Sequence, residues 1–181
     1  MSKFIPMLLL TGASAFAATD GLLVFDTKLQ GQLYSPLAKL PNGQDTFGNR
    51  LYFREKSHLN GRIIYLEKGQ GTVNSAVFGG PGVAWAMSTP GHTQTVESYS
   101  IVKVNLTTGK VIAAAETKDV GMVISFPAIL EYSPAKDWIK VRGARGFTVS
   151  QGLPSPKSEV YWLSLDKNGL KIEKSFPYSV R

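Results

Sequence analysis

Apolar and polar residues alternate along much of the chain, in short stretches that are separated by glycine, proline or asparagine. The clearest stretch is 98–116, where Val102 and Val104 would point to one side and Lys103 and Asn105 to the other. A period of two residues is typical of a β-strand with one buried and one exposed face. The pattern therefore predicts a half-buried strand in the first part of this stretch.

A short polar loop interrupts the same stretch, and a second apolar run begins after it at Val111. Gly109 lies in this loop. Glycine can adopt the positive φ that closes a tight turn, whereas a residue with a Cβ would be strained there. The loop and the two runs beside it are therefore predicted to form a β-hairpin.

Similar runs recur along the chain and predict an all-β, antiparallel fold, because no segment longer than one turn has a helical period. A single helical turn is expected at 35–40, where Ser35 can cap a turn that starts with Pro36. Pro127 is expected to separate the strands beside it, because proline lacks the N–H that a central strand requires. The runs predicted as strands are 21–27, 50–54, 61–66, 72–78, 83–87, 99–106, 120–126, 128–132, 137–142, 159–165 and 170–176.

Four places share a turn signature: an apolar strand end, then an acid or its amide, then a glycine a few residues later. The acid or amide can accept hydrogen bonds from the turn backbone, and the glycine supplies the left-handed conformation. The first two steps between these places are roughly 40 residues and the last is longer. The four places are Phe25-Asp26 with Gly31, Leu66-Glu67 with Gly71, Val104-Asn105 with Gly109, and Leu165-Asp166 with Gly169.

This signature resembles the outer strands of β-propeller blades, whose repeat is about 40 residues. The resemblance covers most of the chain after residue 17 and implies a small propeller of about four blades. An antiparallel β-sandwich or an open barrel uses the same turns, so both remain alternatives.

The first residues have the order of a secretory signal peptide. Lys3 supplies a positive charge, 4–10 form a short apolar core, and Ala15-Phe16-Ala17 is a small-x-small cleavage site. Cleavage there would leave one all-β domain, 18–181, with no transmembrane segment. The absence of cysteine excludes disulfides and fits a periplasmic or secreted protein of a bacterium.

The formal net charge of +7 favours anionic partners. For an exported chain these would be a partner protein or an anionic component of the cell envelope, and nucleic acid is not expected. A charge of this size also serves solubility alone.

The sequence carries no catalytic motif and predicts no cofactor and no metal site. Cysteine chemistry is absent, and nucleophile elbows, phosphate-binding loops and dinucleotide fingerprints do not occur. The two histidines, His58 and His92, both fall in predicted loops. A triad is defined by geometry rather than by closeness in sequence, so the sequence assigns neither histidine a catalytic role.

A candidate binding surface lies in the stretch 138–147. As a strand, this stretch would place Trp138, Lys140 and Arg142 on one face, and Arg145 and Phe147 would extend that face across a loop. A tryptophan beside cations is typical of binding hot spots. The alternative is that the tryptophan packs under a loop and the cations protect a solvated sheet edge.

Two functions are compatible with these features. The first is a non-catalytic binding protein of the cell envelope, such as an inhibitor, an immunity factor, an adaptor or a surface-assembly subunit. The second is a hydrolase or lyase whose loop histidines and carboxylates converge only in three dimensions. The scarcity of histidine and the lack of a motif favour the first.

Overall fold

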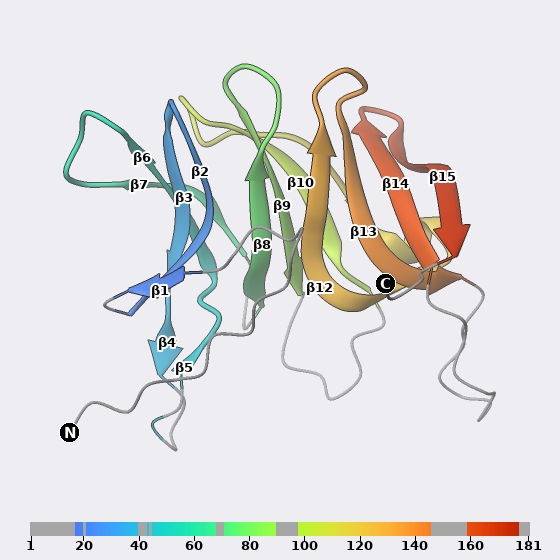
Figure 1. The fold of residues 1–181 in the computed structure, drawn as a ribbon, viewed down its shortest axis with the longest axis horizontal. Coiled ribbons are helices and arrows are strands. Elements are labelled where there is room, and N and C mark those ends of the chain that lie inside the picture. The colour runs from blue at the N-terminus through green and yellow to red at the C-terminus, as the bar shows by residue number, and fades with distance from the viewer. Residues whose placement is uncertain are drawn as a thin grey trace.

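The structure is a computed structural model that describes residues 17–19, 21–39, 43, 45–67, 71–89, 98–145 and 159–177. These residues form three antiparallel β-sheets of four or five strands and one two-stranded ladder (Figure 1). The prediction of an all-β, antiparallel fold is confirmed. No helix in the described part of the chain is long and apolar enough to span a membrane.

The first sheet has the strand order β1-β2-β3-β6-β7. A small ladder of β4 and β5 lies between β3 and β6 in the chain. The bounds are β1 (Ala17–Thr19), β2 (Leu22–Lys28), β3 (Gly31–Pro36), β4 (Ala38–Lys39), β5 (Asp45–Thr46), β6 (Arg50–Glu55) and β7 (Arg62–Leu66).

The second and third sheets are simple meanders, with orders β11-β10-β9-β8 and β12-β13-β14-β15. A single 3₁₀ turn, η1 (Thr117–Val120), leads from one to the other. The strands are β8 (Thr72–Phe78), β9 (Val83–Thr89), β10 (Ser100–Asn105), β11 (Val111–Glu116), β12 (Met122–Ser133), β13 (Trp138–Arg145), β14 (Glu159–Asp166) and β15 (Gly169–Pro177).

The three sheets stack face to face, with the second sheet in the middle (Figure 1). Side chains on both faces of β8 and β9 are therefore buried. Phe78 belongs to the same core as Leu33 of the first sheet, whereas Trp85 belongs to the same core as Tyr161 of the third. The result is two apolar cores, one on each side of the middle sheet.

The architecture among the described residues is thus a sandwich-like stack of three sheets. Each strand order has two ends, so none of the described sheets closes into a barrel. The turn signature implied about four blades, or alternatively a sandwich or an open barrel. The described residues form three blade-like meanders. The first long strands of these meanders, β2, β8 and β12, lie side by side.

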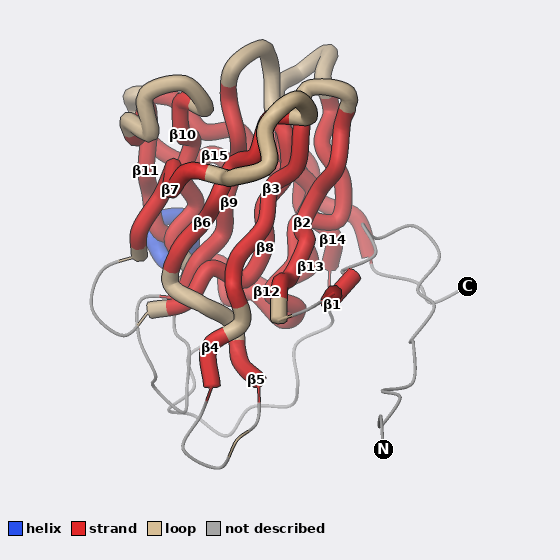
Figure 2. The backbone as a smooth tube through the Cα atoms, turned by 90° about the vertical axis from the view of Figure 1, so that its left-hand side faces the viewer, coloured by secondary structure: helices blue, strands red, loops and turns tan. Residues whose placement is uncertain are grey.

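Hairpin turns of all three sheets lie at one end of the stack (Figure 2). The turn between β10 and β11 has the predicted chemistry. Gly109 adopts a φ of 68°, and the Asn105 side-chain oxygen accepts hydrogen bonds from the N–H groups of Thr107 and Thr108 at 2.9 and 2.8 Å. The prediction of a glycine-closed hairpin is confirmed.

Replacing Gly109 by Val is expected to lower the free energy of unfolding by about 1–2 kcal/mol, because the left-handed region is costly for a residue with a Cβ. Denaturant unfolding of the two proteins measures the difference. Gly109→Asn is the control and should lose much less, because Asn tolerates this conformation. Equal stability of the Val variant and the wild type would contradict the role assigned to this glycine.

Two local predictions are wrong. The helical turn expected at 35–40 is not formed by the described residues 35–39: β3 continues to Pro36 and β4 follows at Ala38–Lys39. Pro127 does not separate two strands, because β12 runs through it. This strand lies at the edge of its sheet, and its pairing with β13 is irregular around the proline, so the missing N–H is tolerated.

The turn signature at Glu67 and Gly71 does not lie in a hairpin. It connects β7 of the first sheet with β8 of the second. The Glu67 side chain is buried and accepts a hydrogen bond from the hydroxyl of Ser88 on β9. This acid therefore joins the first sheet to the second.

Candidate binding surface

The third sheet ends the stack, and one of its faces points away from the middle sheet. On β13, Ile139 and Val141 are fully buried in the core beneath. Strand alternation then places Trp138, Lys140 and Arg142 on the outer face, where each keeps part of its surface exposed. The structure therefore brings these three predicted residues together on one face.

A row of charged and aromatic side chains crosses this face along the strand pairing. Lys140 on β13 lies opposite Trp162 on β14, which lies opposite Lys174 on β15. The Lys140 Nζ atom is 4.8 Å from the centre of the Trp162 ring and also forms an ion pair with Glu131 on β12. A cation over a tryptophan ring is attracted by the ring quadrupole, so Lys140 is held in place from two sides.

A second row lies beside the first. Arg142 is opposite Val160 on β14, and Val160 is opposite Phe176 on β15. Phe176 is 50% exposed although it is a large apolar residue. The two rows together give this face three cations and several apolar side chains. We call it the basic-aromatic face; its residues are Trp138, Lys140, Arg142, Val160, Trp162, Lys174 and Phe176.

Trp138 is the first residue of β13 and follows the β12–β13 turn. Its ring is partly buried, and the Lys136 Nζ atom is 5.9 Å from the ring centre. The tryptophan is thus neither a core residue nor a fully exposed one.

The other two predicted residues do not join this face among the described residues. Arg145 is the last residue of β13 rather than part of a loop. Alternation puts it on the side of Ile139 and Val141, where its backbone and its charge act on Tyr161. Phe147 lies outside the described residues. The expectation that Arg145 lies in a loop is therefore wrong, because the strand continues further than expected.

Sequence reasoning missed the half of the face that β14 and β15 supply. Trp162 lies between the buried residues Tyr161 and Leu163, so it points to the opposite side of β14, and this alternation can be recognised in the sequence. Its alignment with Lys140 and Lys174 depends on the pairing register of three strands. One strand alone does not carry that information.

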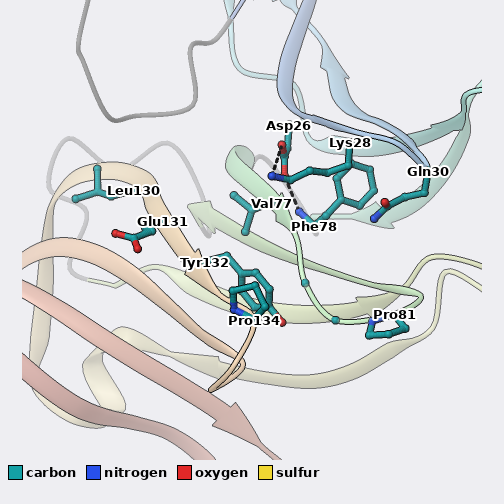
Figure 3. Close-up of a pocket in the computed structure, with 12 residues that line it drawn as sticks. Asp26, Lys28, Gln30, Val77, Phe78, Pro81, Leu130, Glu131, Tyr132 and Pro134 are labelled. Atoms are coloured by element: carbon teal, nitrogen blue, oxygen red, sulfur yellow. Dashed lines mark hydrogen bonds and ion pairs between the residues drawn. The ribbon is translucent and has the colours of Figure 1, made fainter.

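A pocket of about 650 Å³ lies where the first long strands of the three sheets converge (Figure 3). Its lining includes the apolar residues Val77 and Phe78 at the end of β8. The Asp26 side chain accepts a hydrogen bond from the Phe78 N–H at 2.9 Å and thereby joins the first sheet to the second. Glu131 lies at the pocket and also pairs with Lys140, so the pocket and the basic-aromatic face share this residue.

The β12–β13 turn beside the pocket is fixed to the middle sheet by Asp137. Its carboxylate accepts hydrogen bonds from the Trp85 Nε1–H at 3.2 Å and from the Tyr132 hydroxyl at 3.0 Å. It also pairs with the Lys103 Nζ atom at 2.5 Å, and this atom is 4.3 Å from the centre of the Trp85 ring. The start of β13 is thus positioned by side chains of the middle sheet.

Burial, followed by the hydrogen bond to Asp137 and the charge of Asp137, raises the pKa of Tyr132 to about 12. A raised pKa means that the folded protein holds this proton more tightly than the unfolded chain does. The corresponding stability is fully present below about pH 10 and is lost as the pH rises through about 12.

We therefore expect the free energy of unfolding to fall between pH 10 and pH 12. Tyr132→Phe should make this fall shallower, although Tyr65, Tyr99 and Tyr161, whose pKa values burial also raises, still contribute. Chemical unfolding of both proteins at several pH values measures the slopes. Identical slopes would contradict a raised pKa at Tyr132.

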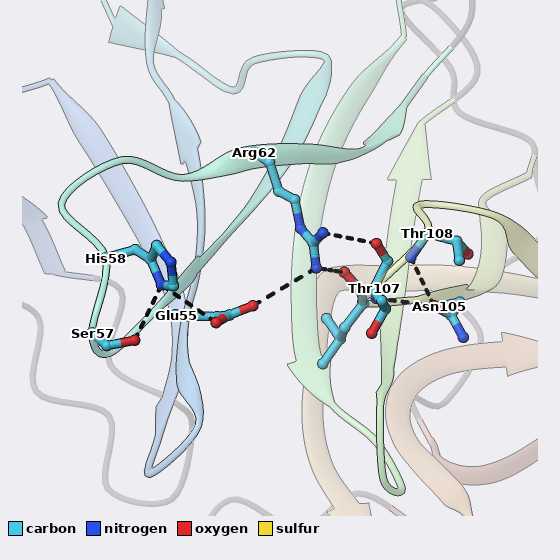
Figure 4. Close-up of polar contacts among 8 residues, drawn as sticks. Glu55, Ser57, His58, Arg62, Asn105, Thr107 and Thr108 are labelled. Atoms are coloured by element: carbon cyan, nitrogen blue, oxygen red, sulfur yellow. Dashed lines mark hydrogen bonds and ion pairs between the residues drawn. The ribbon is translucent and has the colours of Figure 1, made fainter.

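One histidine can be placed. The His58 Nδ1 atom lies 3.3 Å from the Glu55 carboxylate and 3.1 Å from the Ser57 hydroxyl, in an exposed turn (Figure 4). A catalytic triad needs the acid on one ring nitrogen and the nucleophile on the other. Both partners here meet the same nitrogen, so this group is not a triad. His92 lies outside the described residues.

Arg62, in the same view, joins the first sheet to the middle sheet. Its guanidinium donates to the Thr107 carbonyl at 2.7 Å and to the Leu106 carbonyl (Figure 4). Within the described ranges, no group of three or more acids and histidines could hold a metal ion.

Comparison with known proteins gives no match: no family model, no curated protein and no solved structure is significantly similar to this chain.

Proposed function

We propose that the protein is a non-catalytic binding protein of the cell envelope, such as an inhibitor, an immunity factor, an adaptor or a surface-assembly subunit. The observation that carries this proposal is the basic-aromatic face, on which cations and partly exposed aromatic side chains lie together on a rigid sheet. Aromatic residues and arginine are enriched in binding hot spots, and cations steer acidic partners.

The rigidity of the scaffold supports the same function. The face lies on paired strands over a buried core, and Asp137 fixes the turn at which β13 begins. A site on strands is held more precisely than a site on loops. Such a surface needs no rearrangement before it binds.

The location in the envelope rests on the sequence of the first 17 residues, of which 1–16 lie outside the described residues. The alternative function, a hydrolase or lyase, gains no support from the described residues, because His58 meets its acid and its serine through one nitrogen.

Reversing the charges of Lys140 and Arg142 to Glu is expected to weaken binding roughly tenfold, because two cations that steer an acidic partner are replaced by like charges. The protein without its first 17 residues serves as bait in an envelope extract, and the recovered partner is then titrated against each variant. Binding should also weaken as salt is added.

Lys56→Glu with Lys110→Glu is the matched control. It changes the net charge by the same amount at exposed turns of the other two sheets. Melting curves of both variants show whether the fold is retained. Equal binding by the two double variants would remove the basic-aromatic face from the proposal, and failure to recover any partner would remove the proposed function itself.

A further inference from the structure

We infer that the basic-aromatic face binds an extended acidic segment of a partner protein, whose carboxylates pair with Lys140, Arg142 and Lys174 and whose apolar side chains lie over Val160, Trp162 and Phe176. This inference rests on the proposed function and names the chemistry of the partner. It also assigns to binding four residues of β14 and β15 that sequence analysis did not single out.

The position of the face in the stack is the first argument. Both faces of the middle sheet are covered at β8 and β9, and the inner face of the third sheet packs against it. Among the described residues no sheet covers the outer face of β12–β15. Phe176 there keeps half of its surface exposed and extends the partly exposed apolar side chains Val160 and Trp162 across the face.

The charge of the face is the second argument. Two acids lie beside its three cations: Glu131, which pairs with Lys140, and Glu173, which accepts a hydrogen bond from the uncharged Ser164 hydroxyl at 2.5 Å. Lys174 is exposed and adds a cation on the far strand. Three cations and two carboxylates leave the face with an excess of positive charge, which favours a partner that brings carboxylates.

The same charge argues against a second copy of this chain. Two basic-aromatic faces would meet with like charges, which costs affinity. The first sheet, at the other end of the stack, carries Arg54 over the Tyr34 ring at 5.6 Å and is cationic there too. Neither end of the stack is complementary to the basic-aromatic face.

The spacing of the cations fits an extended polypeptide. Lys140 and Arg142 are two residues apart on one strand, so they are separated by roughly 7 Å along it. Carboxylates at alternate positions of an extended segment have the same separation. Lys174 lies two strands away, roughly 10 Å across the sheet. Trp162 and Val160 occupy the strand between the cations, where apolar side chains of the segment would lie.

The aromatic rings favour a protein surface over a lipid surface. Trp162 has Lys140 over its ring and Trp138 has Lys136 near its ring, and both tryptophans are partly buried. Membrane adsorption by such a face relies on aromatic side chains that reach into the acyl boundary. Rings held against the sheet with cations over them instead resemble the preordered anchors of a protein interface.

The test is site-specific photocrosslinking in cells that produce the full chain. A photoreactive phenylalanine analogue is placed at Phe176 on the face and, in a second strain, at the exposed Ile112 on β11 of the middle sheet. The expected result is a crosslink from position 176 to a protein, mapped by mass spectrometry to a segment with acids at alternate positions. Lys174→Glu should reduce its yield at least fivefold, whereas Lys110→Glu should leave it unchanged.

Lys174 is exposed, so its reversal does not endanger the fold, and a melting curve checks this. A crosslink from position 112 but none from position 176 would overturn the inference and leave the proposed function standing. A crosslink from 176 to a segment without acidic residues would overturn it as well. The purified protein is also mixed with vesicles of anionic phospholipid: binding lost in Lys174→Glu, without a protein crosslink from 176, would assign the face to lipid.

Discussion

Replacing Asp137 by Ala is expected to lower the free energy of unfolding by about 3 kcal/mol. The change removes the carboxylate that pairs with Lys103, whose side chain is only 12% exposed, and leaves that cation without its partner. Breaking a buried ion pair costs about 3–5 kcal/mol. Asp137 itself is 49% exposed, which reduces the cost because water screens its charge.

A second contribution comes from the buried indole. Trp85 is fully buried, and its Nε1–H donates to Asp137. A buried donor without an acceptor costs about 1–3 kcal/mol. The two losses share one site and do not simply add, so the expected total stays near 3 kcal/mol. For a domain of this size, that corresponds to a fall in Tm of roughly 6–12 °C.

Two further variants separate the causes. Asp137 adopts a positive φ of 55°, which glycine tolerates better than alanine does. Asp137→Gly removes the carboxylate without that strain, and Asp137→Asn keeps an acceptor and a residue type that tolerates the left-handed region. We expect the loss to be largest for Ala, smaller for Gly and smallest for Asn, as measured by urea unfolding. If the Ala and Asn variants were equally stable, neither the lost hydrogen-bond acceptor nor the backbone strain of Ala would lower the stability as argued.

Alternation of apolar and polar residues was enough to predict most of the strands, because each sheet has at least one buried face. The hairpin at Gly109 was predictable for a local reason: the glycine conformation and the Asn105 side chain are set within a few residues of each other. The fold class follows from such local signals. The stacking of three sheets does not, because it depends on which apolar faces meet.

The candidate surface was predictable in part for the same reason. Alternation along one strand groups Trp138, Lys140 and Arg142, but it does not say that β13 reaches Arg145. Trp162 and Lys174 join the face through the register of neighbouring strands, and the pocket at Asp26, Phe78 and Glu131 needs three distant segments. Such relations are set by the core rather than by any short stretch of sequence.

Glu67 shows how a local pattern can mislead. A strand end followed by an acid and a glycine favours a turn in which the acid accepts backbone hydrogen bonds. Here the strands on either side of the acid belong to different sheets, and the carboxylate is 7% exposed. It accepts hydrogen bonds from the Tyr65 hydroxyl at 2.7 Å and from the Ser88 hydroxyl. The sequence singled out the acid, but it did not predict that the acid pairs with Ser88 on β9.

Replacing Glu67 by Ala is therefore expected to lower the free energy of unfolding by about 2–3 kcal/mol. The Ser88 side chain is fully buried, and it would lose the acceptor of its hydroxyl. An unsatisfied buried donor costs about 1–3 kcal/mol. The loss is limited because the Tyr65 hydroxyl lies 3.4 Å from the Ser88 hydroxyl, so the two can partly satisfy each other. Removal of the side chain also leaves a space beside Gly71, which packs against it.

The matched control is Glu67→Gln, which keeps the shape and one acceptor oxygen and should lose about 1 kcal/mol or less. Ser88→Ala in the Glu67→Ala background completes a double-mutant cycle. It should cost less there than in the wild type, because the hydroxyl has already lost its acceptor. Urea unfolding of the four proteins gives the coupling energy. An additive result would mean that the Ser88–Glu67 contact does not hold the first and second sheets together.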